Sequence, residues 1–220
     1  MKNLSQKIIK FNYEKNFKND DFYVSKSNKH VFDLLNQWPK WERNFLNISG
    51  EKFSGKTHLI NIFLKKFKGI KVDANFLKNK DLKEIKIHEN IILENFNANI
   101  DEELTYSLFN IIDQDNKFLI INSTILASEI DFKLDDLRSR TKHCLIARIE
   151  KPDDDLMFAL ILKNFSDRQI IIDKKLIDYI IKRVERSYGK IFEFIYKIDK
   201  ISLKKKKSID FKIINEALEE

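Results

Sequence analysis

The feature that most restricts the fold is a glycine-containing octapeptide between two different apolar patterns. Residues 50–57 read GEKFSGKT. A short apolar run, Phe45–Ile48, precedes the octapeptide, and the stretch after it, Thr57–Phe67, places its apolar residues on one helical face. The pattern predicts a buried strand, a tight loop and an amphipathic helix, a unit that requires a sheet for the helix to pack on.

The octapeptide matches G-x-x-x-x-G-K-[ST] at every fixed position, which is typical of loops that hold nucleotide phosphates. Backbone N–H groups of such a loop point at phosphate oxygens, and Gly50 and Gly55 permit the close approach. Lys56 is expected to neutralise the β and γ oxygens and the Thr57 hydroxyl to coordinate Mg²⁺, while the helix N-terminus faces the anion. A chance match in a turn is the alternative.

Four more short apolar runs, rich in β-branched residues, are predicted to be buried strands. They are Gly69–Val72, Ile91–Leu93, Lys117–Asn122 and Cys144–Ile149. Amphipathic stretches lie between them, among them Asp101–Asp113 with its acidic first turn. This alternation predicts an α/β fold with a five-stranded parallel sheet that helices cover on both faces.

The pattern changes near Pro152, and the rest of the chain reads mainly as helices. The predicted helices are Asp154–Asn164, Asp173–Ser187, Lys190–Ile201 and Phe211–Leu218, with one weak strand candidate at Gln169–Ile172. We therefore expect an N-terminal segment (1–20), an α/β domain (21–150) and a small α-helical lid domain (151–220).

The composition narrows the class of protein. Charged residues make up 34% and apolar residues 43% of the chain, which fits a soluble globular protein, and no apolar run is long enough to span a membrane. Cys144 is the only cysteine, so an intramolecular disulfide is excluded. A cytoplasmic protein is expected. The net charge of +7 favours a nucleic-acid partner only weakly, because the lysines are spread along the chain.

An acidic residue follows the predicted strand Ile91–Leu93, where a carboxylate partner of Mg²⁺ is expected. This residue is Glu94, and Asn95 comes next, where hydrolytic enzymes of this class usually carry a carboxylate that polarises the attacking water. An amide cannot act as a general base, so hydrolysis is predicted to be slow. A compensating carboxylate within Asp101–Glu103 is the alternative.

With these motifs, almost the whole chain resembles the DnaA/Hda family of AAA+ replication-initiation proteins, closest to the Hda-type regulator of alphaproteobacteria. "ENF" at 94–96 resembles Asp-Asn-Ile of Hda more than Asp-Asp-Ile of DnaA, and Trp38 and Trp41 flanking Pro39 resemble the same branch. The segment Asp21–Asn28 resembles the one that contacts adenine, which implies base contacts at Phe22 and Val24.

The resemblance also implies the remaining nucleotide contacts, for ADP or ATP with Mg²⁺ on Thr57 and Glu94. In the loop and the helix after it these are Gly50, Lys52, Phe53, Ser54, Gly55, Lys56, Thr57 and His58. Asn122 matches the first sensor, although a strand-end amide that caps its loop is equally compatible. Lys190, in "SYGKIFEFI", stands where the family usually has the arginine of the second sensor.

"DLRSR" (Asp136–Arg140) resembles the box that contains the family's arginine finger. Arg140 is the matching position, follows a predicted loop and precedes the strand Cys144–Ile149. A guanidinium there is expected to stabilise charge on the triphosphate of a neighbouring subunit, which is catalysis in trans. The alternative is a surface arginine with no such role, like the nearby Arg138.

The N-terminus contains a motif of its own. Residues 6–11 read QKIIKF and follow Q-x-x-[LIM]-x-F, the pattern of peptides that bind the sliding clamp of DNA polymerase. Gln6, Ile9 and Phe11 would be anchors in a preformed groove. The alternative is an N-terminal strand packed on the core.

Together these features predict an Hda-like regulator that binds adenine nucleotide and the clamp and stimulates hydrolysis of DnaA-bound ATP. The chain ends at Glu220, without the helix-turn-helix DNA-binding domain of DnaA, which fits this expectation. A homodimer is possible, and no membrane partner is expected. The alternatives are a DnaA-like or helicase-loader-like ATPase, and an adaptor that uses its lysines on a DNA or membrane surface.

Overall fold

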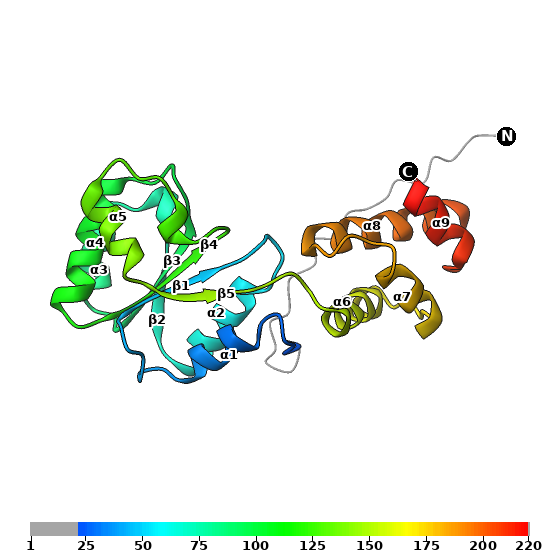
Figure 1. Ribbon diagram of the computed structural model, residues 1–220, viewed down its shortest axis with the longest axis horizontal. Coiled ribbons are helices and arrows are strands. Elements are labelled where there is room, and N and C mark those ends of the chain that lie inside the picture. Colours follow the sequence, from blue (N-terminus) through cyan, green and yellow to red (C-terminus); the bar gives the residue numbers. More distant parts are fainter. Residues whose placement is uncertain (1–21, 220) are drawn as a thin grey trace.

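The protein is built on one parallel sheet of five strands. The computed structural model describes residues 22–219, so the clamp-binding hypothesis for Gln6, Ile9 and Phe11 lies outside the described residues. The strands are β1 (Phe45–Ser49), β2 (Gly69–Asp73), β3 (Asn90–Phe96), β4 (Phe118–Ser123) and β5 (Leu145–Arg148), in the order β2-β3-β4-β1-β5 (Figure 1). The predicted α/β fold with a five-stranded parallel sheet is confirmed.

Helices cover both faces of this sheet. On one face lie α1 (Lys29–Asn36) and α2 (Lys56–Lys66), and on the other α3 (Asn79–Ile85), α4 (Glu102–Gln114) and α5 (Asp135–Lys142), with two short 3₁₀ turns at Ala74–Phe76 and Ala127–Glu129 (Figure 1). Alternate residues of each strand face opposite layers. Ile91 and Leu93 lie in the core with α4, whereas Ile92 lies in the core with α1 and α2. Strands that are apolar on both faces are typical of this architecture.

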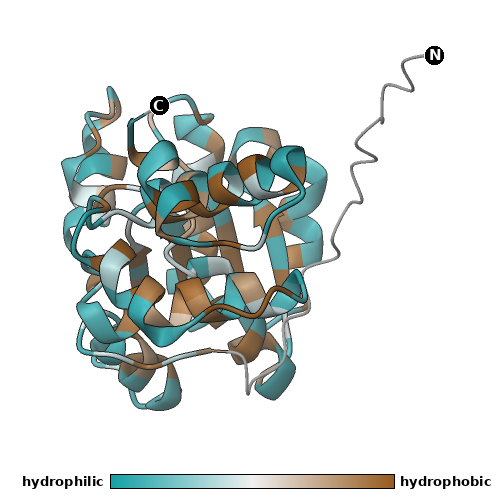
Figure 2. Ribbon diagram, turned by 90° about the vertical axis from the view of Figure 1, so that its right-hand side faces the viewer, coloured by the Kyte–Doolittle hydropathy of each residue, from teal (hydrophilic) through white to brown (hydrophobic). Residues whose placement is uncertain are grey.

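The C-terminal helical domain has its own core. It consists of α6 (Asp154–Asp167), α7 (Lys174–Ile181), α8 (Tyr188–Lys205) and α9 (Phe211–Glu219). Figure 2 looks onto this side of the molecule and shows apolar and polar residues alternating along its helices, as expected when each helix buries one face. The buried faces meet around Phe165, Ile177, Ile195 and Ile214.

Three local predictions were wrong. Gln169–Ile172 is no strand but the connection between α6 and α7, where Gln169 has a φ of 59° and Ile171 is 99% exposed. The helix predicted over Asp173–Ser187 ends at Ile181, because the chain turns there and the Ser187 side chain caps α8 instead. Arg140 does not follow a loop; it lies in the last turn of α5.

A small hydrogen-bond network joins the two domains where the chain passes from β5 to α6. The Ser27 hydroxyl donates to Asp153 Oδ2 at 2.9 Å, and Oδ1 of the same carboxylate accepts from the Leu156 N–H at 2.8 Å, which caps α6. The Glu150 N–H donates to the Ser27 carbonyl at 2.9 Å. The segment before α1 is thereby tied to the first residues of the helical domain. Within residues 22–219, no helix has the length and apolar character to cross a membrane.

Candidate nucleotide-phosphate site

The glycine loop lies where predicted, between the carboxyl end of β1 and the first turn of α2. Gly55 is the N-cap of α2 and has a φ of 92°, in the left-handed region that side chains disfavour. A Cβ at Gly55 would also lie 3.2 Å from the Phe22 ring. The loop therefore requires glycine here for two reasons. Because Gly55 caps α2, the N-terminus of this helix directly follows residues 50–55.

Lys56 is wrapped by the loop that precedes it. Its ammonium donates to the carbonyls of Gly50 at 2.6 Å and Glu51 at 2.8 Å, and only 8% of the residue is exposed. Burial lowers the pKa of Lys56 to about 8, although the negative charges of Glu94 and Glu51 partly oppose this shift. The loop thus holds a desolvated cation at the start of a helix, an arrangement suited to an anion.

Glu94 and Asn122 lie together on the neighbouring strands β3 and β4. The Asn122 side-chain amide donates to Glu94 Oε2. The other carboxylate oxygen, Glu94 Oε1, is buried with no hydrogen-bond partner and lies 3.8 Å from the ammonium of Lys71. The structure therefore places Glu94 and Asn122, the predicted acidic residue and first sensor, in contact. They lie close enough to the loop for the Glu94 charge to raise the pKa of Lys56.

The Lys71 contact was missed by the sequence analysis. Lys71 lies on β2, whose register places it opposite Ile92, with Asp73 opposite Glu94. A lysine in a strand of a basic chain carries no local signal, so only the pairing of β2 with β3 could have revealed it.

Asn95 is fixed by a residue that the sequence analysis did not consider. It has a φ of 58°, and its amide donates to Asp73 Oδ2 at 2.6 Å. Asp73 also accepts from the backbone and the side chain of Asn75. Burial opposes ionisation of Asp73, but these hydrogen bonds outweigh it and keep the pKa of its carboxyl below the usual value.

The carboxylates considered as compensating bases are mostly engaged in local structure. Asp101 caps α4 by accepting from the Leu104 N–H at 3.0 Å. Glu102 accepts from the backbone N–H groups of Lys133 and Leu134. Asp73 is thus the carboxylate in direct contact with Asn95.

The predicted base-contacting segment reaches the loop through Phe22. Its ring makes an edge contact with His58, with centroids 5.5 Å apart, and stacks on Phe32 at 6.3 Å. Val24 is exposed on the surface. Of the remaining predicted loop contacts, Ser54 is buried near the Lys56 ammonium, whereas the side chains of Lys52, Phe53 and Thr57 are exposed.

An open groove lies between the loop and α8 of the helical domain. Its lining residues are Glu51, Phe53, Ser187, Gly189, Lys190, Phe192, Glu193 and Tyr196. Glu51, one of these residues, accepts from the Ser187 hydroxyl and from the Tyr188 N–H at 3.1 Å. Lys190 lies in the groove, but its ammonium donates to Glu193 at 3.0 Å, and this bond raises the Lys190 pKa. The contact of Lys190 with a nucleotide stays a prediction.

Arg140 and the glycine loop lie at opposite ends of the strands. The helix α5 ends at Lys142, directly before β5 begins, so Arg140 lies near the amino ends of the strands, whereas the loop follows the carboxyl end of β1. Its guanidinium donates to Asp113 Oδ2 at 2.9 Å and to Asn110 Oδ1 at 3.0 Å, both on α4. One third of the side chain is exposed. Arg140 cannot serve its own loop from this position.

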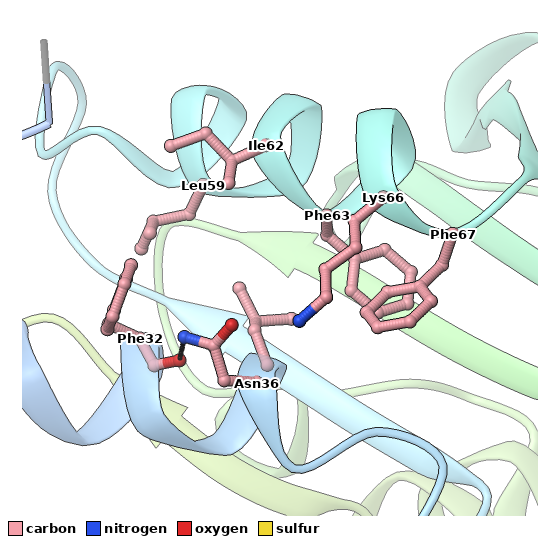
Figure 3. A pocket seen from close by; sticks show the side chains of 8 residues that line it. Phe32, Asn36, Leu59, Ile62, Phe63, Lys66 and Phe67 are labelled. Carbon is pink, nitrogen blue, oxygen red and sulfur yellow. Dashed lines mark hydrogen bonds between the residues drawn. The ribbon is translucent and has the colours of Figure 1, made fainter. Parts of the chain in front are cut away.

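A second depression, between α1 and α2, is unrelated to this site. Figure 3 shows it lined by apolar side chains that include Phe32, Leu59, Ile62, Phe63 and Phe67, with Lys66 reaching across. Its polar residue Asn36 donates to the Phe32 carbonyl at 3.0 Å (Figure 3). This crevice reads as helix packing. In residues 22–219, no cluster of three or more histidine, cysteine or acidic side chains could hold a metal ion.

The phosphate site nevertheless offers the oxygens that Mg²⁺ prefers when phosphates complete its coordination. The exposed Thr57 hydroxyl stands at the start of α2, and Glu94 Oε1 is buried without a hydrogen-bond donor. These oxygens fit the ion that the loop implies, and Thr57 and Glu94 would hold it.

The chain is similar in sequence to chromosomal replication initiator proteins. No known protein-family profile matches the chain. The chain is 27% identical to the chromosomal replication initiator protein DnaA of Thermoanaerobacter pseudethanolicus, over 91% of this chain and 51% of that protein. It is 26% identical to DnaA of Caldanaerobacter subterraneus over the same shares. The chain thus spans about half the length of the curated relatives it matches.

Solved structures show the same fold. Domain III of Thermotoga maritima DnaA superposes with a TM-score of 0.72 at 17% identity, covering 94% of this chain and 97% of that one. The AMPPCP-bound DnaA of Aquifex aeolicus gives 0.68 at 19% identity, with 84% and 66% covered. Thermotoga maritima RuvB, a Holliday junction branch migration motor, gives 0.69 at 17% identity, with 93% and 72% covered. The chain therefore has the AAA+ fold of DnaA domain III, and its sequence is similar to that of DnaA proteins.

Proposed function

We propose that the chain binds an adenine nucleotide and acts with DnaA in the control of replication initiation. The observation that carries the nucleotide proposal is the assembly of Lys56, Glu94 and Asn122 around the start of α2. The solved DnaA of Aquifex aeolicus with this fold is described as bound to AMPPCP, an adenine nucleotide analogue, which supports adenine as the base.

Each residue of the site has a distinct task in this proposal. The loop N–H groups and the α2 N-terminus receive the phosphates, and the Lys56 ammonium turns from the loop carbonyls toward them. Asn122 holds the Glu94 carboxylate in place. The Phe22 ring packs against the loop at Gly55. Bound Mg²⁺ would neutralise phosphate charge between Thr57 and Glu94.

The site is better suited to retain a nucleotide than to hydrolyse it. Its Asn95 amide cannot accept the proton of an attacking water, and the Asp73 carboxylate beside it already accepts three hydrogen bonds. A low intrinsic ATPase activity follows. This property favours a regulator that uses its nucleotide as a structural element.

The catalytic contribution in this proposal is made to a partner. Arg140 lies near the amino ends of the strands, at the opposite end of the sheet from its own loop, and is partly exposed. This is the placement expected for a guanidinium that reaches across an interface. There it would stabilise developing charge on ATP held by DnaA. The bonds to Asp113 and Asn110 would hold Arg140 until the partner docks. The peptide with Gln6, Ile9 and Phe11 is proposed to bring the protein to the sliding clamp.

A second candidate is a DnaA-like or helicase-loader-like ATPase that acts on replication complexes directly. The similarity to DnaA along 91% of this chain favours it. It requires hydrolysis by the chain's own site, so the steady-state ATPase rate of the purified protein separates the two candidates.

The deciding experiment measures turnover of ATP prebound to DnaA, with clamp loaded on DNA, in the presence and absence of this protein. Stimulation by the wild type and its loss in Arg140→Ala are expected. Lys142→Ala is the matched control, because this exposed cation lies in the same last turn of α5. Absence of stimulation, or equal stimulation by Arg140→Ala and wild type, would refute the regulatory proposal.

A further inference from the structure

Lys71 adds a cation to the phosphate site that the motifs do not include. It lies on β2, and its ammonium donates to Asn61 Oδ1 on α2 and lies 3.8 Å from Glu94 Oε1 on β3. Its side chain is 35% exposed and that of Glu94 is 15% exposed. The ammonium is therefore anchored to α2 next to the carboxylate oxygen that has no hydrogen bond of its own.

The position of Lys71 changes the electrostatics that a phosphate would meet. A partly buried carboxylate next to a phosphate-binding loop repels the phosphates unless a cation lies between them. In this chain the Glu94 carboxylate already has Lys71 close to Oε1, and the Lys56 ammonium also feels its charge. A divalent ion bound at Oε1 would share the Glu94 carboxylate with the Lys71 ammonium, so it would add less to phosphate binding than at an unpaired carboxylate.

We infer that Lys71 is an internal counter-cation of this site and lets it bind a nucleoside diphosphate with little dependence on Mg²⁺. The inference rests on the proposed nucleotide binding and adds a specificity determinant to it. Lys71 neutralises Glu94, and Lys56 with the α2 N-terminus then receives the phosphates. Phosphate binding beside Glu94 then depends less on Mg²⁺, because Lys71 already balances the charge of this carboxylate.

The test is calorimetric titration of ADP into the full chain with excess MgCl₂ and, separately, with EDTA. For the wild type, chelation is expected to change the ADP affinity by less than about threefold. For Lys71→Met, chelation is expected to weaken binding by about tenfold or more, because Glu94 then faces the phosphates unneutralised, and Mg²⁺ is expected to restore it.

A double variant makes the test specific for charge. In Lys71→Met/Glu94→Gln neither charge is present, so the affinity is again expected to be insensitive to chelation. Lys68→Met is the matched control, because Lys68 is an exposed lysine three residues away. It is expected to behave as the wild type does. A thermal melt of each variant without nucleotide reports folding, since a purely structural Lys71 would lower the melting temperature and leave the response to chelation unchanged.

Two failures are distinguishable. If wild type and Lys71→Met bind ADP and lose affinity equally on chelation, the role of Lys71 is refuted and nucleotide binding stands. If folded wild-type protein binds no adenine nucleotide with or without Mg²⁺, the proposed function is refuted and the Lys71 inference falls with it.

Discussion

The side-chain amide of Asn95 donates to Oδ2 of Asp73 at 2.6 Å, at the carboxyl ends of two adjacent strands. Asn95 occupies the position where a hydrolytic enzyme would need a carboxylate. Its partner is an ionised acid that three donor groups already satisfy. The Asp73–Asn95 pair therefore holds one negative charge, and the position where a general base is expected carries an amide.

This contact predicts that Asn95→Asp alone will not create an efficient ATPase. Two carboxylates at hydrogen-bond distance repel each other, which raises one of their pKa values and turns the new side chain away from Asp73 and from the position of the amide. The swap Asn95→Asp/Asp73→Asn leaves a single ionised carboxylate at position 95. We expect its phosphate release from ATP to exceed that of both the wild type and the single variant by about tenfold or more.

Phosphate release is measured at equal saturation with ATP, and Asp73→Asn alone serves as the control. Equal rates in the swap and the wild type would show that the missing base does not limit hydrolysis. A single Asn95→Asp variant as fast as the swap would contradict the proposed repulsion.

The affinity for nucleotide should decrease above pH 8 because of Lys56. Burial places its pKa at about 8 in the free protein, and a bound phosphate would raise that pKa. Below pH 8 the ammonium is already protonated. Above pH 8 binding must take up a proton, so the affinity for ADP should fall by up to about tenfold per pH unit until the pKa of the complex is reached.

The same linkage provides its own control. Titration in buffers of different ionisation enthalpy should show uptake of about one proton at pH 9 and little uptake near pH 7. An affinity that stays constant from pH 7 to 9.5, with no proton uptake, would show that Lys56 does not change its protonation on binding.

Local sequence was sufficient for the sheet and the loop but not for the contacts between elements. The strands could be predicted because short β-branched runs between polar stretches can be buried only in a covered sheet. The loop could be predicted because its spacing has a direct chemical purpose. The short helices α1, α3 and α5 were not predicted individually, since helices of seven or eight residues depend on tertiary packing.

The site residues that were missed depend on pairing and side-chain direction. The Lys71–Glu94 contact requires the order β2-β3, and the Asp73–Asn95 bond requires that register together with the positive φ of Asn95. Lys190 lies in the groove between the loop and α8, and its ion pair with Glu193 on the same helix could not be inferred from the motif. Contacts across strands and domains are set by the whole fold.

Cys144 is predicted to be nearly inert to thiol reagents in the native protein. Burial raises the pKa of its thiol to about 12, with a small opposing effect of Arg43, so the reactive thiolate is scarce at pH 8. We expect its reaction with a disulfide reagent to be at least about a hundredfold slower than in the protein unfolded by urea. Rapid labelling under native conditions would contradict the burial of Cys144 beside β5.

The bond between Glu51 and the start of α8 predicts how firmly the helical domain is held. The Glu51 carboxylate accepts from the Ser187 hydroxyl and the Tyr188 N–H, at the positive end of an 18-residue helix. Glu51→Ala should therefore reduce the free energy of unfolding by about 1–2 kcal/mol. It should also speed amide hydrogen exchange in the first turn of α8 relative to α9.

Glu89→Ala, at an exposed acid before β3, is the matched control and should change neither the free energy of unfolding nor the exchange rate. Unchanged exchange at α8 in Glu51→Ala would show that other contacts between the domains hold the helix in place.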